Sequence, residues 1–389
     1  MIDINDYFDS VSIEKPGYEY LSPAAAFSHN LEIHTDNNAI TFPGNYNIAI
    51  IGVPEERNSP NVGCERGPET IRQRLYMLSR VPGKTKIADF GNMKRGKSFD
   101  DTIAGLCDIL CLLANENIIS VIIGGSSALT LAIDKFFAVK TQPYTLATID
   151  SRIDFHPGGG GNDSFSYLNN IIYSDKSYVN HFVNIGYQTY LNDPQTINWL
   201  QKRKSDLMRV GDVRGYISLT EPLLRDSNAA LIDIASVRQA DAPGTLFPSP
   251  NGFYGEEICL LARYAGISES VRVFGIFEVN PAVDRGFQTS DIAAQIIWFF
   301  LEGFGQRQYE SAMLDDQSTG RFTRYHVQIS GIDEELIFVK SNITERWWME
   351  INNGPGQVKH IACSHEDYLL ANRSEVPDRW IKAISRMNR

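Results

Sequence analysis

Apolar runs of strand length recur along the chain from residue 46 to residue 279, and segments with helical periodicity separate them. Several runs, such as YNIAIIGV at 46–53, are continuously hydrophobic, which is typical of parallel strands covered on both faces. Strands are predicted at 46–53, 86–90, 118–123, 146–154, 181–186, 207–210, 229–234 and 271–279. Helices are predicted after Pro68 and at 100–115, 128–139, 192–203, 214–225, 254–265 and 289–303. This alternation predicts a three-layer α/β/α sandwich with a mostly parallel sheet of about eight strands.

The ends of the chain differ from this pattern. Residues 1–45 are broken by prolines and are predicted to form an N-terminal arm, whereas 46–304 form the α/β domain. Residues 305–389 alternate aromatic and polar positions (FTRYHVQI, ELIFVK, RWWMEI) and close with a short helical pattern near 378–387. We therefore expect a small β-rich C-terminal appendage packed on the main domain. Its Trp347 and Trp348 are expected to fill a core or a subunit contact rather than to bind a ligand.

Charge and composition narrow the functional classes. The formal net charge of −11 makes general binding to nucleic acid phosphates unfavourable. No apolar run approaches the roughly 20 residues of a membrane span, and the N-terminus has no signal-peptide pattern. The five cysteines are odd in number and widely spread, which favours reduced thiols. A cytoplasmic protein is the expectation, with no nucleic acid or membrane partner.

Charged residues gather where the predicted strands end. The segment LATIDSRIDFH carries Asp150, Arg152 and Asp154 at alternate positions, so a continuing strand would point all three to one side. Asp233 and Glu278 follow two other predicted strands. In an open α/β sheet, the crevice beyond the carboxyl ends of the strands is where ligands bind. The alternative is a salt-bridged strand end with no chemistry.

Several short motifs in order carry a resemblance to a known family. The strings GGSSAL, TIDSRIDF, LIDIASVRQADAPG and FEVNPAVD, preceded by GVPEE and GCERGPETIRQRL, resemble the arginase/agmatinase/formimidoylglutamase superfamily, the ureohydrolases. The resemblance covers roughly residues 46–304 and is closer to the formimidoylglutamases. It implies metal-assisted hydrolysis of a non-peptide C–N bond by two manganese ions held by six ligands. It also implies a homo-oligomer.

When the resemblance is carried over residue by residue, three of the six metal-ligand positions keep a residue that can bind a metal. Asp150, Asp154 and Asp233 stand at ligand positions, while Ser127, Arg152 and Ala235 replace two histidines and an aspartate. Glu278 stands at the position that contacts the guanidinium of the substrate. The resemblance thus implies residual metal ligands at Asp150, Asp154 and Asp233, and substrate-binding positions at Glu278 and Arg152.

The replacements argue against a binuclear centre. Arginine stays protonated in proteins, so Arg152 would repel a second divalent ion. Three carboxylates are acceptable to one hard ion, so the cofactor expectation is none, or at best one Mn²⁺ or Mg²⁺ ion. We expect the Arg152 guanidinium to fork between Asp150 and Asp233 in place of the metals. A shifted site built from His156 and Asp163 is the alternative, and Asp154 and His156 are the candidate catalytic residues.

Two functions from different classes follow. The first is a ureohydrolase-fold protein that has lost the two-manganese centre and serves as a non-catalytic binding, regulatory or scaffold protein. The second is a hydrolase of a guanidino, amidino or formimino compound that uses one metal ion or none. The expected partner is a small guanidino or amino-acid-like ligand, or another protein.

Overall fold

The apolar runs form one large sheet in the computed structural model, which describes residues 4–13, 17–18, 20–156, 159–173, 177–315, 320–329, 334–352 and 357–387. Within these residues the sheet has ten strands in the order β1-β4-β3-β5-β10-β9-β6-β7-β8, and β2 also pairs with β4. Their bounds are β1 (Phe8–Asp9), β2 (Glu32–Ile33), β3 (Ile48–Val53), β4 (Ile87–Met93), β5 (Ile119–Gly124), β6 (Tyr144–Ile149), β7 (Val179–Tyr187), β8 (Asp206–Arg209), β9 (Ala229–Asp233) and β10 (Val273–Phe277). Only β1 pairs in the antiparallel sense among these strands.

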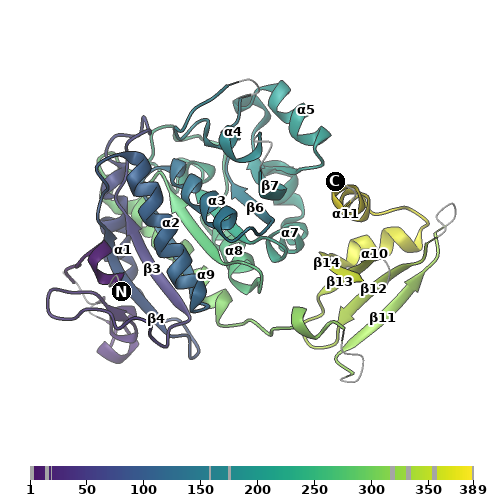
Figure 1. The fold of residues 1–389 in the computed structure, drawn as a ribbon, viewed down its shortest axis with the longest axis horizontal. Coiled ribbons are helices and arrows are strands. Elements are labelled where there is room, and N and C mark those ends of the chain that lie inside the picture. The colour runs from purple at the N-terminus through teal and green to yellow at the C-terminus, as the bar shows by residue number, and fades with distance from the viewer. Residues whose placement is uncertain are drawn as a thin grey trace.

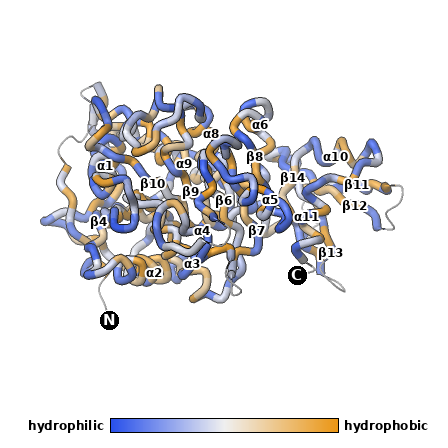
Figure 2. The backbone as a smooth tube through the Cα atoms, turned by 90° about the horizontal axis from the view of Figure 1, so that it is seen from above, coloured by the Kyte–Doolittle hydropathy of each residue, from blue (hydrophilic) through white to orange (hydrophobic). Residues whose placement is uncertain are grey.

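Helices cover both faces of this sheet, as Figure 1 shows. One hydrophobic core contains residues of α1 (Gly67–Met77), α6 (Val210–Gly215), α7 (Glu221–Arg225), α8 (Gly255–Ile267) and α9 (Gln288–Phe304). The core on the other face contains residues of α2 (Phe99–Asn115), α3 (Thr130–Val139), α4 (Tyr167–Ile172) and α5 (Pro194–Lys202). The strands between them are the mostly apolar centre of the molecule in Figure 2. The expected three-layer α/β/α sandwich with a mostly parallel sheet is confirmed.

Local sequence signals set several element boundaries. Helix α2 begins with a capping box, in which the Ser98 side chain accepts from the amide of Asp101 and the Asp101 carboxylate accepts from the amide of Ser98. The expected single helix at 214–225 is wrong, because Gly215 ends α6 and Pro222 lies in the first turn of α7. Proline is suited to the first turn of a new helix and breaks the interior of a continuing one.

The last part of the chain forms a second, antiparallel sheet with two helices. Its strands run in the order β11-β12-β13-β14, with bounds β11 (Phe322–Val327), β12 (Leu336–Ser341), β13 (Trp347–Asn352) and β14 (Val358–Cys363). The helices α10 (His365–Asn372) and α11 (Asp378–Met387) lie beside it, and this unit stands at one end of the molecule (Figure 1). Trp347 and Trp348 are buried, as expected for core residues.

Arg225 joins the appendage to the main domain. Its guanidinium donates to the carbonyl oxygens of Trp347 and Cys363, at 3.0 Å each, and lies 4.5 Å from the ring centre of Trp348. A second link is the ion pair between the Lys382 ammonium and Asp206 in β8, at 2.7 Å. Because Arg225 is only 5% exposed, this contact is part of the protein interior.

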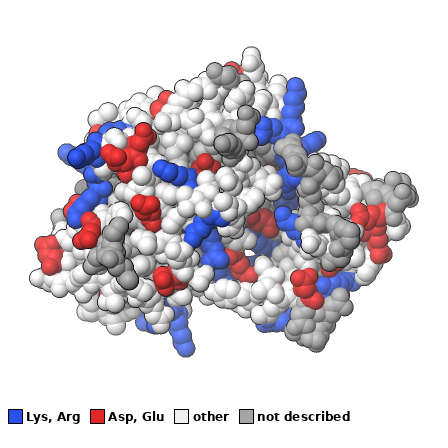
Figure 3. Space-filling view, viewed as in Figure 1, with Lys and Arg blue, Asp and Glu red and all other residues white. Residues whose placement is uncertain are grey.

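Charged side chains of both signs are interspersed on the face of the molecule seen in Figure 3. Among the described residues, no helix combines the length and the apolar character needed to cross a membrane.

Candidate functional site

Four neighbouring strands deliver polar residues to one edge of the sheet. Asp150 follows the last residue of β6, Asp233 ends β9, and Glu278 follows the last residue of β10. These strands are adjacent and parallel in the order β5-β10-β9-β6, so their carboxyl ends meet. Ser127 lies just beyond β5 at the same edge. The strand-end residues expected from the sequence therefore do gather in one place.

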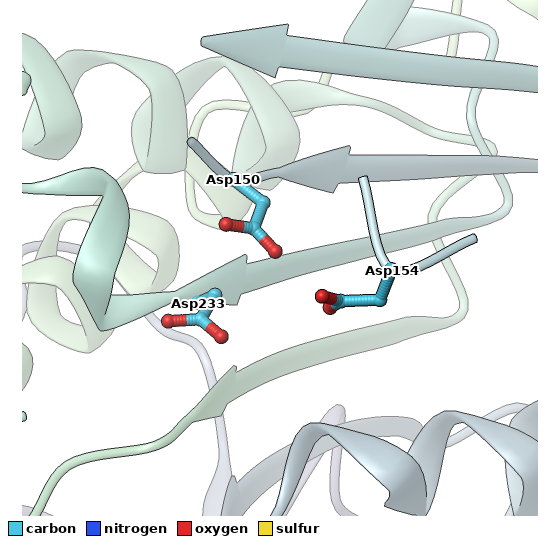
Figure 4. Close-up of side chains that lie close together, drawn as sticks. All are labelled: Asp150, Asp154 and Asp233. Carbon is cyan, nitrogen blue, oxygen red and sulfur yellow. The ribbon is translucent and has the colours of Figure 1, made fainter. Parts of the chain in front are cut away.

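Three aspartates form the centre of the site. Oxygen atoms of Asp150, Asp154 and Asp233 all lie within 4.8 Å of one another, and Figure 4 shows the three carboxylates pointing toward a common space. The side chains are 3%, 3% and 7% exposed, respectively. We call these three residues the acid cluster.

Hydrogen bonds satisfy only part of the acid cluster. Asp150 Oδ1 accepts from the backbone amide of Arg152 at 3.0 Å, and Asp233 Oδ1 accepts from the amide of Ala235 at 2.8 Å. Asp154 Oδ2 is buried and has no hydrogen-bond partner among the described residues. A buried carboxylate oxygen without a donor is costly, so this atom marks a place where a proton or a cation would stabilise the site.

Burial and mutual repulsion oppose ionisation of these acids. Burial, partly offset by the Arg152 charge, raises the pKa of Asp150 to about 6. Burial and the neighbouring Asp150 raise the pKa of Asp233 to about 8, and the same two effects hold the pKa of Asp154 well above its usual range. The pKa of Glu278 is raised to about 7, chiefly by burial and by Asp233. If all four neighbouring carboxyl groups were ionised, their negative charge would exceed the positive charge of Arg152.

The structure corrects the expected position of Arg152. Strand β6 ends at Ile149, so the alternation of strand side chains does not continue through residues 150–154. The guanidinium of Arg152 forms no ion pair with any described carboxylate, and the expected fork between Asp150 and Asp233 is wrong. Its central carbon instead lies 4.2 Å from the ring centre of Phe165 and 5.3 Å from that of Phe247. The aromatic faces attract the cation while it remains in the field of the acids.

Arg152 and the two rings nearly fill the pocket above the acid cluster. The remaining cavity is about 10 Å³, and its lining includes the side chains of Asp233, Glu278 and Ala235. That volume is close to the least that a single water molecule needs. In this conformation the pocket has no room for a small organic ligand.

Glu278 is held by the protein itself. Its Oε1 accepts from the backbone amide of Ser127 at 2.8 Å, and its Oε2 accepts from Asn61 at 2.9 Å and from the Ser59 hydroxyl at 3.2 Å. Glu278 also has a φ of +65°, an uncommon conformation for a residue with a side chain. Ser59 and Asn61 were missed from the sequence, although they lie in the loop after β3, whose carboxyl end faces the same edge.

The structure does not bring His156 or Asp163 to the acid cluster. The His156 side chain is exposed, and its backbone is bonded to Asn169. The Asp163 carboxylate accepts from the amide of Phe165 and from the Ser166 hydroxyl. Among the described residues, the acid cluster is the one group of three or more metal-ligating side chains with its ligand atoms this close.

The acid cluster fits one hard divalent cation and does not fit two. Its ligand atoms are all carboxylate oxygens, which suit Mg²⁺, Ca²⁺ or Mn²⁺, and Asp154 Oδ2 has no hydrogen-bond partner in the described part of the chain. A second ion would need donors at the replaced positions. The Ser127 hydroxyl there donates to the carbonyl of Ser164 at 3.3 Å, the Ala235 side chain has no atom that could bind a metal, and Arg152 is a cation.

Comparisons with known proteins agree with this picture of the fold. The sequence matches the Arginase family over residues 46–302. It is 26% identical over 277 residues to proclavaminate amidinohydrolase of Streptomyces clavuligerus, a match that covers 65% of this chain and 87% of that relative. It is 24% identical over 268 residues to formimidoylglutamase of Ralstonia nicotianae, covering 64% and 81%.

Solved structures share the same architecture. Formimidoylglutamase from Bacillus subtilis superposes with a TM-score of 0.67 at 20% identity, covering 76% of this chain and 97% of that one. Formiminoglutamase from Trypanosoma cruzi, in a crystal structure with manganese, gives a TM-score of 0.64 at 18% identity, covering 72% and 99%. Since the family match spans more than half of the chain and includes the acid cluster, the protein belongs to the arginase family.

Proposed function

We propose that this protein is a ureohydrolase-fold protein that has lost the two-manganese centre and acts as a non-catalytic binding, regulatory or scaffold protein. The observation that carries the proposal is the Arg152 guanidinium, which lies against Phe165 and Phe247 in the pocket above the acid cluster. It puts a permanent positive charge beside the place of the second ion and leaves a cavity of only about 10 Å³.

The replaced ligand positions support the same proposal. The resemblance to the ureohydrolases implies metal ligands at the positions of Ser127, Arg152 and Ala235, and none of these side chains is suited to bind a divalent ion there. One hard ion at Asp150, Asp154 and Asp233 remains compatible with the donors. When bound, such an ion would neutralise the carboxylates and polarise a bound water molecule.

A C–N hydrolase that uses one metal ion or none is the second candidate. It is favoured by the retained Glu278 and by the Asp154 oxygen that no described residue hydrogen-bonds, a group that could hold a proton or a cation. Against it, the Glu278 carboxylate already accepts hydrogen bonds from Ser127, Asn61 and Ser59. A substrate guanidinium would have to displace Arg152 before it reached that carboxylate.

The test combines metal content with turnover. The full chain is purified with and without added manganese, its metal content is measured by elemental mass spectrometry, and it is incubated with guanidino, amidino and formimino compounds. A formimidoylglutamase prepared in the same way is the positive control. We expect at most one ion per chain and no release of urea, formamide or ammonia. Two ions per chain with turnover would overturn the proposal, and turnover with one ion or none would establish the second candidate.

A further inference from the structure

The C-terminal helix α11 is joined to the main sheet at Asp206, the first residue of the edge strand β8. The Asp206 carboxylate accepts from the Lys382 ammonium at 2.7 Å and from Nε2 of His181, in the neighbouring strand β7, at 2.8 Å. The His181 side chain is only 10% exposed. Figures 1 and 2 show α11 beside this end of the sheet. A histidine of the sheet and a lysine of the appendage therefore share one carboxylate.

Helix α11 brings an excess of positive charge to this contact. Besides its lysine, the Arg379 and Arg386 side chains act on His181 through space, and Arg379 also acts on Asp206. Asp367 of α10 lies 3.8 Å from Arg379, but it belongs to the same appendage. While His181 is neutral, the three cations of α11 face the negative charge of Asp206. A proton on His181 cancels that charge, so the attraction between α11 and the sheet is lost.

The docked position of α11 favours the neutral form of His181. Burial lowers the pKa of His181, the hydrogen bond with Asp206 partly offsets this, and the charges of Arg386 and Arg379 lower the pKa further. Once α11 moves away, water reaches the ring and the arginines withdraw, so the pKa of His181 returns toward its ordinary value of about 6.5. The released form therefore takes up a proton more readily than the docked form. The docked form consequently loses stability as the pH falls through this range.

We propose that His181 is a proton-sensitive switch, which keeps α11 on β8 at neutral pH and releases it in mild acid. The rest of the appendage stays attached, because Arg225 donates to the carbonyl oxygens of Trp347 and Cys363 at a separate contact. Release removes a contact from the edge strand β8, which pairs with β7 alone among the described strands. An open edge strand can pair with a strand of another chain. This inference is independent of the proposed function.

Hydrogen exchange of the full chain at about pH 7.5 and about pH 5.5 is the direct test, with rates corrected for the intrinsic effect of pH. At about one pH unit below the ordinary histidine pKa, proton uptake multiplies the released-to-docked ratio about ten-fold. We therefore expect α11 and β8 of the wild type to lose about ten-fold in protection at the lower pH. Exchange is read segment by segment, because Asp134 of the main domain has a pKa of about 6 and titrates in the same range.

Substitution of the histidine makes the test specific. His181→Gln keeps a side-chain amide that can donate to Asp206 but cannot take up the proton, so it should abolish the acid-induced loss of protection. His326→Gln is the matched control, because His326 is bonded to Glu335 within the appendage, at 3.0 Å. The control should lose protection in α11 and β8 as the wild type does.

Substitution of the lysine tests the coupling from the other side of the contact. Lys382→Met should loosen α11 already at neutral pH and should raise the pKa of His181, which is measured by NMR titration of the ring. Lys340→Met is its control, because the Lys340 side chain is 27% exposed against 26% for Lys382 and pairs with Glu345 of the appendage. This control should change neither the protection of α11 nor the titration of His181.

The outcomes decide the proposal in each case. Acid-induced release that persists in His181→Gln would overturn it, because another group would then be the sensor. Equal protection of α11 at both pH values in the wild type would overturn it as well. If His181→Gln does not fold, the NMR titration decides, since a His181 pKa that is the same in Lys382→Met as in the wild type would show that docking and protonation are not coupled. Metal content and turnover test the proposed function separately.

Discussion

Substitution of Asp154 by asparagine should have opposite effects on the metal-free and the metal-loaded protein. Asparagine matches aspartate in shape but cannot ionise, whereas ionisation of Asp154 is opposed by burial and by Asp150, which raise its pKa. Asp154 Oδ2 is buried and has no hydrogen-bond partner among the described residues. The asparagine amide would be a donor among acceptors, so we expect the free energy of unfolding to rise by about 1–3 kcal/mol.

In the presence of a divalent ion, the same substitution should be unfavourable, because it removes a ligand of the ion. The four carboxylates of Asp150, Asp154, Asp233 and Glu278, with the Arg152 guanidinium, carry a formal charge of −3 when all are ionised. One divalent ion reduces it to −1, whereas two ions would give +1 in a buried site. The wild type should therefore bind a single ion. Asp154→Asn should weaken that binding at least ten-fold, which is about 1.4 kcal/mol.

Calorimetric titration with Mn²⁺ and Mg²⁺, together with unfolding curves in chelator, measures both effects. Asp134→Asn is the matched control, because Asp134 is another acid whose pKa is raised by burial and it lies outside the acid cluster. It should stabilise the chain without changing ion affinity. Destabilisation of the metal-free protein by Asp154→Asn, or an unchanged ion affinity, would show that Asp154 is neither an uncompensated acid nor a metal ligand.

Three other changes test separate parts of the structure. Ser127→His, Arg152→His and Ala235→Asp together should allow two manganese ions per chain by elemental analysis, and a folded, metal-free triple variant would show that the positional transfer from the family is wrong. Burial raises the pKa of Asp134 to about 6 from an ordinary value near 3.8, so the native state binds more protons and its stability falls as pH rises between these values. Asp134→Asn should thus add nothing near pH 4 and on the order of 2 kcal/mol at pH 7 in urea unfolding, and a pH-independent gain would contradict this. Arg225→Met leaves two buried carbonyl oxygens without their donor and should cost about 3–5 kcal/mol, with faster proteolysis of the appendage, whereas unchanged stability would mean that this contact contributes little.

Strand patterns were sufficient to predict where the acids meet. The runs that became β6, β9 and β10 are mostly apolar, and parallel strands bring their carboxyl ends to the same edge. Asp150, Asp233 and Glu278 could be placed at that edge from these two rules alone. Both rules describe regular strand backbone, so they apply only as far as the strands extend.

The same rules failed for Arg152, three residues beyond the end of the strand. A fork of Arg152 between two acids requires the strand to continue through residue 154, but β6 ends at Ile149. Its real neighbours, Phe165 and Phe247, come from two loops distant in sequence. No local pattern marks a loop aromatic as the neighbour of a particular cation. Likewise, the two-residue strands β1 and β2 are too short to show any periodicity.

The replaced positions are best understood together, through charge. Relative to the pattern implied by the family resemblance, Ala235 removes one negative charge and Arg152 adds one positive charge. The two changes shift the formal charge by the same amount as one divalent ion. Loss of a metal ion alone would leave buried carboxylates uncompensated, which is strongly destabilising. Under the proposed function, the Arg152 guanidinium against Phe165 would compensate for one divalent ion without the coordination geometry that a metal demands, so the fold could keep its acid cluster with one ion fewer.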